Sequence, residues 1–428
     1  MKHNTFFRYR RKNTPFFSKN KIDKNLKTLS GELNIYEDLL PTHYISKICG
    51  LLPIRKIQLK NGEYSGELST SGIFYGILLI IILMLAQAWG LWRDLRHGWK
   101  NSTRLSSKTA VTVTCTDVVS IAGVTITSVL CVPLKWKHIQ QSLHHLIQVN
   151  RKLKSLEVAR IQTNIIIFLW LLPVLIIISI LDYYTWLYAN KRNNLAPRED
   201  RGPINYSPIY LMYIVNTVFE IQYALIVSYM GKILEIINRI LQQQFTRYKF
   251  HQFLKRIIEE DQKTVEKKIS LLVNLHDDLL NSIRSLNMGF GLPILFAVLN
   301  CFIHLIITAY FAYIELHDDN CSWRILSMQI VWIIFHIIGL LIIVQPCYWC
   351  ITMNKEIGTL ICKLIVVNKK LHILKRLEVF SHQLLFRPLE FSVCGLFYID
   401  RRLCTSIASA ITTYLVILIQ FQGNGDDN

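Results

Sequence analysis

The chain has 428 residues, of which 51% are hydrophobic and 18% are charged. Soluble domains carry about 25% charged residues, so this composition excludes an ordinary soluble enzyme. The 48 Lys and Arg residues against 29 Asp and Glu residues give a net charge of +19. Long apolar runs separate the basic residues, so they do not form the single basic patch that nucleic-acid binding requires, and no nucleic-acid partner is expected.

The N-terminal segment is basic and polar. Residues 1–22 contain no apolar core of the kind that a signal peptide needs, and the first long apolar run begins near Gly72. We therefore expect the first transmembrane helix to target the chain, with residues 1–71 as a cytoplasmic arm of the mature protein.

Seven segments are long and apolar enough to cross a bilayer, which takes about 20 residues per helix. They are residues 72–92, 110–134, 165–188, 207–230, 290–314, 325–349 and 403–421. The second segment is rich in Thr and Ser, so we expect it to face other helices or water rather than lipid. The predicted fold class is an all-α membrane protein with seven transmembrane helices.

The distribution of Lys and Arg predicts the orientation, because these residues stay on the cytoplasmic side. With a cytoplasmic N-terminus, the inner segments hold 38 of them and the outer segments hold 10. Three glycosylation motifs, at Asn101, Asn205 and Asn320, all fall in predicted outer loops. Both signals predict a cytoplasmic N-terminus, an extracellular C-terminus and a glycoprotein, a topology opposite to that of G-protein-coupled receptors.

Long helical extensions are expected on the cytoplasmic side. Residues 232–288 contain no Pro or Gly, which favours one long helix that runs into the fifth span. An apolar stripe at alternating steps of four and three calls for a partner helix. It consists of Val265, Ile269, Leu272, His276, Leu279, Ile283 and Leu286. Residues 360–377 show similar amphipathicity, so we expect the extensions of spans four to seven to form a packed bundle and an oligomer contact. Helices lying on the anionic inner leaflet are the alternative.

These features divide the chain into seven predicted parts, in order: an arm, four spans, a cytoplasmic long helix, two spans, a cytoplasmic anchor with re-entry, a last span and an extracellular tail. Their bounds are 1–71, 72–231, 232–289, 290–350, 351–402, 403–421 and 422–428.

The end of the last span carries a recognisable motif. Thr413 and Tyr414 are followed by five hydrophobic residues and then by Gln420 and Phe421. This pattern resembles the ending of insect gustatory receptors. Two further blocks resemble that family, one before the last span and one entering the fifth span. Their matching residues are Phe391, Gly395, Leu396, Phe397, Asp400, Leu275, His276, Leu279, Leu286, Asn287 and Phe290.

The resemblance implies a tetrameric ligand-gated cation channel in the plasma membrane of a chemosensory neuron, either a homomer or a heteromer with related receptors. The last helix of each subunit would line the pore, and a small-molecule tastant would bind in the outer half of each bundle. The sweet-sensing branch usually carries Glu after the motif Tyr, whereas this chain has Leu415. The resemblance therefore favours a bitter, unassigned or fructose-like receptor over a disaccharide receptor.

Within the motif, Tyr414, Ile417 and Phe421 share one helix face, and Gln420 lies beside Ile417 and Phe421. An apolar ring can hold a channel shut by dewetting, and a polar ring beside it can help ions through. We expect these four residues to form the gate; ordinary helix packing is the alternative.

Charged and aromatic residues at membrane depth are the candidates for ligand binding, because a buried charge there costs about 2.5–3.5 kcal/mol. The alternatives are that the acids pair with neighbouring Tyr, Thr or Lys groups, that His304 and His336 are core histidines, and that the tyrosine belongs to an interfacial belt. The candidates are Asp117, Asp182, Tyr184, Glu220, His304 and Trp332.

A transporter and an enzyme are the two rival classes. A transporter of a small polar solute would show repeated halves with paired broken helices. Pro173, Pro293 and Pro346 interrupt spans, but no repeat is visible. An enzyme is not expected, because no nucleophile, metal or phosphate motif is present, and neither a cofactor nor a metal is expected.

Overall fold

The computed structural model describes residues 40–58, 64–96, 108–154, 169–192, 202–254, 262–317, 321–368 and 370–423. In this part of the chain, seven helices are long and apolar enough to cross a membrane, as the sequence predicts. The spanning helices are α4 (Thr70–Arg96), α5 (Lys108–Lys154), α7 (Leu171–Arg192), α9 (Pro208–Leu254), α10 (Gln262–His317), α11 (Trp323–Val367) and α13 (Arg401–Gly423).

Shorter elements connect or precede these helices. They are α3 (Leu40–Ile48), α8 (Gly202–Asn205), α12 (Leu371–Phe386) and two antiparallel hairpins, β1 (Ile54–Gln58) with β2 (Tyr64–Leu68) and β3 (Ser392–Val393) with β4 (Phe397–Tyr398).

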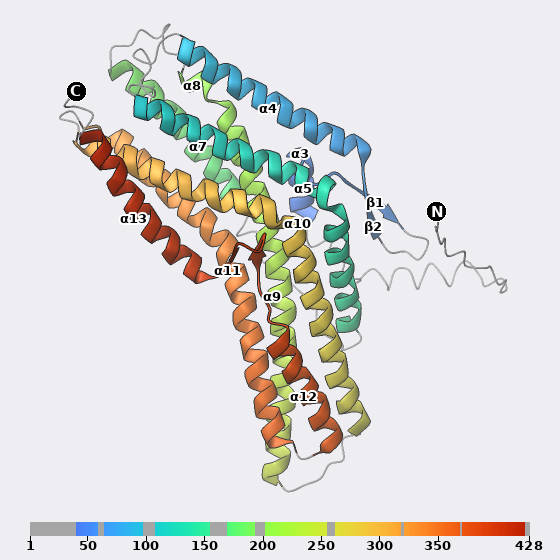
Figure 1. The fold of residues 1–428 in the computed structure, drawn as a ribbon. Coiled ribbons are helices and arrows are strands. Elements are labelled where there is room, and N and C mark those ends of the chain that lie inside the picture. Colours follow the sequence, from blue (N-terminus) through green and yellow to red (C-terminus); the bar gives the residue numbers. More distant parts are fainter. Residues whose placement is uncertain are drawn as a thin grey trace, which may run out of the picture.

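The spanning helices fall into two groups by length. Helices α4, α7 and α13 have 27, 22 and 23 residues, close to the length that a bilayer requires. Helices α5, α9, α10 and α11 have 45 to 56 residues and therefore extend well beyond it. Figure 1 shows these extensions, together with α12, as a stalk below the spanning bundle.

The stalk corrects the expectation of one helix over residues 232–289. Helix α9 ends at Leu254 and α10 begins at Gln262, and the two run in opposite directions (Figure 1). The expectation that the cytoplasmic helix runs into the fifth span is correct, since α10 continues without interruption into that span. The stalk also includes the end of α5, which was not expected there and packs extensively along α10.

The apolar stripe of α10 lies inside the protomer. All seven of its residues, from Val265 to Leu286, are buried, and Leu272 is 1% exposed. Helices α5, α9, α11 and α12 supply the partner surfaces. The stripe is therefore part of the stalk core, and it is not free to form a seam between subunits.

The amphipathic segment 360–377 is also divided. Helix α11 ends at Val367 because Asn368 adopts an extended backbone, and the Asn368 side-chain oxygen accepts a hydrogen bond from the Lys370 backbone N–H at 3.0 Å. Helix α12 then starts at Leu371 and turns back along the stalk, where Ile373, Leu377 and Phe380 are buried. An Asn side chain that bonds its own backbone two residues on is a known turn device, so the break has a local cause.

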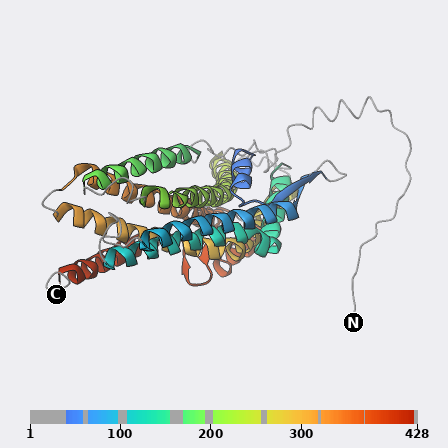
Figure 2. The same ribbon diagram turned by 90° about the horizontal axis from the view of Figure 1, so that it is seen from above.

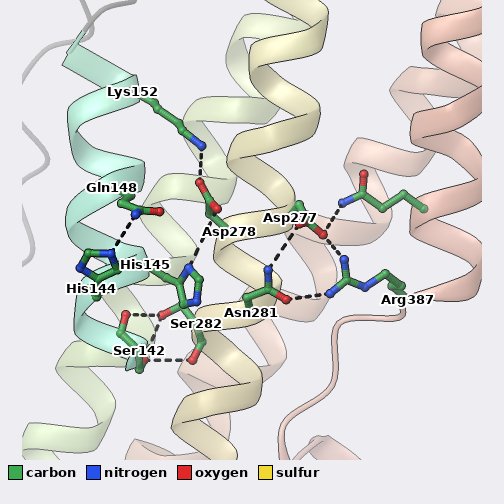
Figure 3. Close-up of polar contacts among 11 residues, drawn as sticks. Ser142, His144, His145, Gln148, Lys152, Asp277, Asp278, Asn281, Ser282 and Arg387 are labelled. Carbon is green, nitrogen blue, oxygen red and sulfur yellow. Dashed lines mark hydrogen bonds and ion pairs between the residues drawn. The ribbon is translucent and has the colours of Figure 1, made fainter. Parts of the chain in front are cut away.

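Polar contacts tie α5 and α12 to α10 within the stalk (Figure 3). The hydroxyl oxygens of Ser142 and Ser282 lie 2.9 Å apart, and each hydroxyl lies within 2.9 Å of the backbone carbonyl oxygen of the other residue, to which it can donate. Lys152 contacts Asp278 at 2.5 Å, and Arg387 pairs with Asp277. These contacts join segments that are more than 100 residues apart and fix the order in which the helices pack.

Helix α5 explains the Thr-rich second span. The hydroxyl of Thr125 is buried and donates to the carbonyl of Ile121 at 2.9 Å, and Thr127 makes the same kind of bond to Gly123 at 2.7 Å. Such bonds within the helix satisfy hydroxyls away from water. The expectation that this span faces other helices is confirmed, since α5 packs against α4, α9 and α10.

Helix α13 lies along the outside of the bundle (Figures 1 and 2), and it contacts only α10 and α11 to any extent among the described elements. The β3–β4 hairpin leads into it. At the hairpin turn, Cys394 and Gly395 have positive φ angles of 51° and 74°, a conformation that favours glycine. Phe391, at the base of the hairpin, is fully buried and anchors the turn to the core.

Candidate functional site

A small polar cavity lies among the spanning helices, and four of the six predicted ligand residues line it. Asp117 comes from α5, Asp182 from α7, His304 from α10 and Trp332 from α11. Helix α9 contributes Tyr210 and Tyr213. The cavity volume is about 50 Å³, which is room for a few water molecules.

Asp117 and His304 form the first polar pair in its wall. The Nδ1 atom of His304 lies 2.8 Å from an Asp117 carboxylate oxygen, and both side chains are almost completely buried. The Nε2 atom of the same ring lies 2.8 Å from the Tyr213 hydroxyl. Three helices that are far apart in sequence thus meet in one polar contact, which offsets the cost of burying a carboxylate at membrane depth.

Asp182 forms the second polar group. Its carboxylate accepts a hydrogen bond from the Tyr210 hydroxyl at 2.5 Å and one from the Trp332 indole N–H at 3.0 Å. Both expected roles of this residue are therefore compatible with its position, because it pairs with neighbouring side chains and also faces the cavity.

Aromatic rings that line the cavity pack against one another. The rings of His304 and His336 are nearly parallel, with centroids 4.4 Å apart, and His336 also stacks on Trp332 at 5.6 Å. The Tyr213 ring lies 5.0 Å from Trp332. Polar edges combined with flat apolar faces are the usual lining of a small-molecule site.

His336 is a cavity residue that the sequence reasoning treated as part of the core. Its ring is buried, and its Nε2 atom has no hydrogen-bond partner among the described residues. Gln329, Trp332 and His336 recur at steps of three and four on α11, so they share one face of that helix. This helical spacing is a sequence signal by which His336 could have been grouped with Trp332. Nothing in the sequence singled out Tyr210 and Tyr213, because tyrosine is common near membrane interfaces.

Glu220 lies in an adjoining cavity of about 10 Å³, which shares Tyr213 and His336 with the first cavity. The Asn216 side-chain N–H donates to the Glu220 carboxylate at 3.1 Å, and no described Lys or Arg pairs with that carboxylate. A Cβ atom at Gly339 would lie 3.2 Å from its Oε2 atom, so a glycine gives the carboxylate its space.

The remaining predicted residues lie elsewhere. Tyr184 is 55% exposed on α7 and lines neither cavity. Tyr414, Ile417 and Gln420 lie on the exposed side of α13, with the Tyr414 ring edge-on to Phe302 at 5.9 Å. The side chain of Phe421 is outside the described residues.

Of the three glycosylation candidates, Asn101 and Asn320 lie outside the described residues. Asn205 is buried on α8, and its amide nitrogen donates to Asp94 of α4. A Cβ atom at Gly90 would collide with the Asn205 backbone, so the two segments are in close contact. This environment leaves no room for a glycan and disfavours modification of Asn205.

Comparison with known proteins agrees with this architecture. A family model described as 7tm chemosensory receptor matches residues 39–424. The gustatory receptor for sugar taste 43a of Drosophila melanogaster is 26% identical, and the match covers 91% of this chain and 99% of that protein. The putative gustatory receptor 28b of the same species is 35% identical over 22% of this chain and 20% of its own length.

Solved structures show the same fold. The insect olfactory receptor OR5 from Machilis hrabei superposes with a TM-score of 0.58 at 11% identity, covering 94% of this chain and 99% of that one. The same receptor in complex with eugenol gives a TM-score of 0.54 at 13% identity, covering 90% of this chain and 97% of that one.

The seven spanning helices of the described chain and these matches define a multi-pass receptor of the plasma membrane, rather than an enzyme. The match across most of its length shows that the chain belongs to the 7tm chemosensory receptor family. The expected resemblance to gustatory receptors is thereby confirmed.

Proposed function

We propose that this protein is a gustatory receptor that acts as a ligand-gated, non-selective cation channel and depolarises a chemosensory neuron when it binds a tastant. The observation that carries the proposal is the meeting of Asp117, Asp182, His304 and Trp332 at one cavity. Five spanning helices border that cavity, so a ligand bound there would contact most helices of the bundle.

The proposed ligand is a small polyhydroxylated molecule of the monosaccharide class. Two carboxylates can accept hydrogen bonds from ligand hydroxyls, and the Trp332 and Tyr213 rings offer flat apolar faces to a sugar ring. The relative whose name states sugar taste supports the same class. Leu415 stands where the sweet-sensing branch usually carries Glu, which argues against a disaccharide as the ligand.

The size of the cavity suggests how binding is coupled to gating. About 50 Å³ is too small for a monosaccharide, so the ligand must push apart the side chains that now fill the space. Trp332 and Tyr210 are held by Asp182, and a ligand hydroxyl can replace either of their hydrogen bonds. A ligand that binds only the widened bundle shifts the protein toward that state.

Opening would be completed at α13, on the outside of the bundle. Four copies of this helix around an axis would bring together the exposed residues Tyr414, Ile417 and Gln420, with Phe421 beside them. The low burial of α13 supports this arrangement, because an apolar helix that lines an assembly has its partners in other subunits. The assembly is proposed as a tetramer, either of this chain alone or with related receptors.

Whole-cell current during a ligand panel tests the function. Cells that express the chain should show an inward cation current with one or more monosaccharides, and no current with the disaccharides or alkaloids of the panel. Uptake of the solute without a cation conductance would instead identify a transporter.

The proposed orientation has its own test. An epitope tag after Asn428 should be stained on intact cells, and a tag before Met1 should be stained only after permeabilisation. The reverse pattern would overturn both the orientation and the extracellular access of ligand to the cavity.

A further inference from the structure

A second and larger cavity lies at the start of the first span, far from the polar cavity in sequence. Its volume is about 410 Å³, and its walls come from α3, the following turn and the first turns of α4. The residues that line it are Tyr44, Lys47, Ile48, Gly50, Leu52, Pro53, Ser69, Ser71, Gly72 and Tyr75.

The walls of this cavity combine one positive charge with hydroxyl groups and apolar surface. Lys47 is the only charged residue among the described residues of the lining, and Ser69 and Ser71 present hydroxyls 2.9 Å apart. The Tyr75 hydroxyl donates to the carbonyl of Ile48 at 2.7 Å, which ties α4 to the end of α3. An ammonium group beside hydroxyls suits a phosphate group, which accepts hydrogen bonds and carries negative charge.

The cavity is held open by a rigid frame. Gly50 adopts a φ angle of 72°, and a Cβ atom there would lie 3.0 Å from the Gly76 backbone. The turn after α3 therefore packs directly on α4. Leu51 and Ile54, on either side of Pro53, are buried in the main core. The turn that forms part of the cavity wall is consequently packed into the folded structure.

An exposed apolar stripe leads away from the cavity along α4. It starts at Tyr75 and recurs at steps of three and four, so its residues lie on one helix face. These residues are Tyr75, Leu78, Ile82, Leu85 and Trp89, and each is exposed. From Tyr75 to Leu85 the helix rises about 15 Å, which is half the thickness of a bilayer core.

The position in the membrane suits an anionic lipid. The cavity lies at the N-terminal end of the first span, and residues 1–71 contain 13 Lys and Arg. In the orientation proposed above, which this excess of basic residues supports, that end lies in the cytoplasmic leaflet, which contains the anionic lipids. Tyr44 and Tyr75 lie where aromatic rings commonly meet the headgroup layer.

We propose that this cavity binds the phosphate headgroup of an anionic phospholipid from the cytoplasmic leaflet, with Lys47 as the cationic contact and one acyl chain lying along the α4 stripe. Because the lipid contacts both α3 and the first spanning helix, it fixes the N-terminal segment to the bundle. The site is separate from the polar cavity and does not depend on the identity of the tastant.

Native mass spectrometry of the purified full-length chain in detergent tests the proposal, with added phosphatidylserine or phosphatidylcholine. The wild type should retain phosphatidylserine in preference to phosphatidylcholine. Lys47→Gln should weaken retention of phosphatidylserine about five-fold, the effect of one basic residue at a membrane surface. Lys47→Arg should preserve it. Arg55→Gln is the matched control, because Arg55 is an exposed basic residue nearby that does not line the cavity.

A second variant and a soluble competitor test whether the lipid binds in this cavity and whether its acyl chain contributes. Ser71→Trp should block the cavity by bulk and reduce retention even if Lys47→Gln cannot be purified. Soluble glycerophosphoserine should compete poorly, because it lacks the acyl chain. Equal loss in Lys47→Gln and Arg55→Gln, unchanged retention in Lys47→Gln and Ser71→Trp, or full competition by glycerophosphoserine would each overturn the proposal.

Discussion

The indole N–H of Trp332 on α11 donates a hydrogen bond to the carboxylate of Asp182 on α7, with 3.0 Å between nitrogen and oxygen. Helix α7 has few buried residues of its own, so this bond and the contact of Asp182 with Tyr210 hold it against the bundle. The same carboxylate faces the polar cavity. A ligand that competes for Asp182 therefore also changes what holds α7 in place.

Asp182→Asn should raise the ligand concentration for half-maximal current about ten-fold. The substitution keeps the size of the side chain but replaces the charged acceptor that a ligand hydroxyl would bond by a neutral one, and a hydrogen bond to a charged group contributes about 1.5–3 kcal/mol. Dose-response curves of whole-cell current measure the effect. Tyr184→Phe is the matched control, since Tyr184 lies on the same helix but outside the cavity. Equal shifts in both variants would argue against a ligand role for Asp182.

Glu220→Gln should fold and reach the surface as well as the wild type. The Asn216 N–H can still donate to the new amide oxygen, and the substitution removes a charge that no described Lys or Arg offsets. Glu220→Leu should lower the thermal unfolding midpoint, because it leaves the Asn216 amide without its partner. Thermal unfolding followed by size-exclusion chromatography measures both. A lower midpoint for Glu220→Gln would show that the charge itself stabilises the bundle.

Leu272→Asp should prevent folding of the protomer and not merely its assembly. Leu272 is 1% exposed in the stalk core, and a charge there has no partner. Total protein and surface expression should fall together. Asn274→Asp, an exposed position two residues away on the same helix, should have little effect. A well-folded monomer of Leu272→Asp would instead indicate that the stripe lies at a subunit interface, as the sequence suggested.

Phe421→Ala should raise the resting current, because a dewetted gate depends on bulk and apolarity. Gln420→Glu should favour divalent cations, since four carboxylates would form a negative ring, and Gln420→Leu should lower the conductance. Single-channel conductance and reversal potential are measured together with surface expression. Reduced expression with both electrical quantities unchanged would mean that these residues only pack against neighbouring helices.

Hydropathy and spacing were sufficient for much of the fold. The seven spans, the buried stripe of α10 and the inward-facing second span follow from periodicity, because a helix in lipid must satisfy its backbone internally and bury its polar side chains. The turn at Asn368 was missed because the apolar pattern continues across it. The break between α9 and α10 was missed because no Pro or Gly marks it. Residues 135–154 of α5 were missed because they are polar enough to resemble a loop.

The polar cavity was partly predictable for the same reason. A charge at membrane depth is rare, so Asp117 and Asp182 stood out, and both line the cavity. Their partners Tyr210 and Tyr213 were not distinctive, since tyrosine is common at membrane interfaces. Which acids share a cavity depends on how α5, α7 and α9 pack, and pairing of helices far apart in sequence is not encoded in any local pattern. Glu220 therefore could not be assigned to its separate cavity from the sequence.

Reconstitution of the purified chain tests the central claim most directly. The protein is placed in liposomes that contain a cation-sensitive dye, and flux is measured on addition of the monosaccharide identified in cells. The account predicts a ligand-dependent cation flux in the wild type that needs a much higher ligand concentration in Asp182→Asn. Absence of any ligand-dependent flux, or an identical response in the two proteins, would contradict the claim that this chain is a channel opened from its polar cavity.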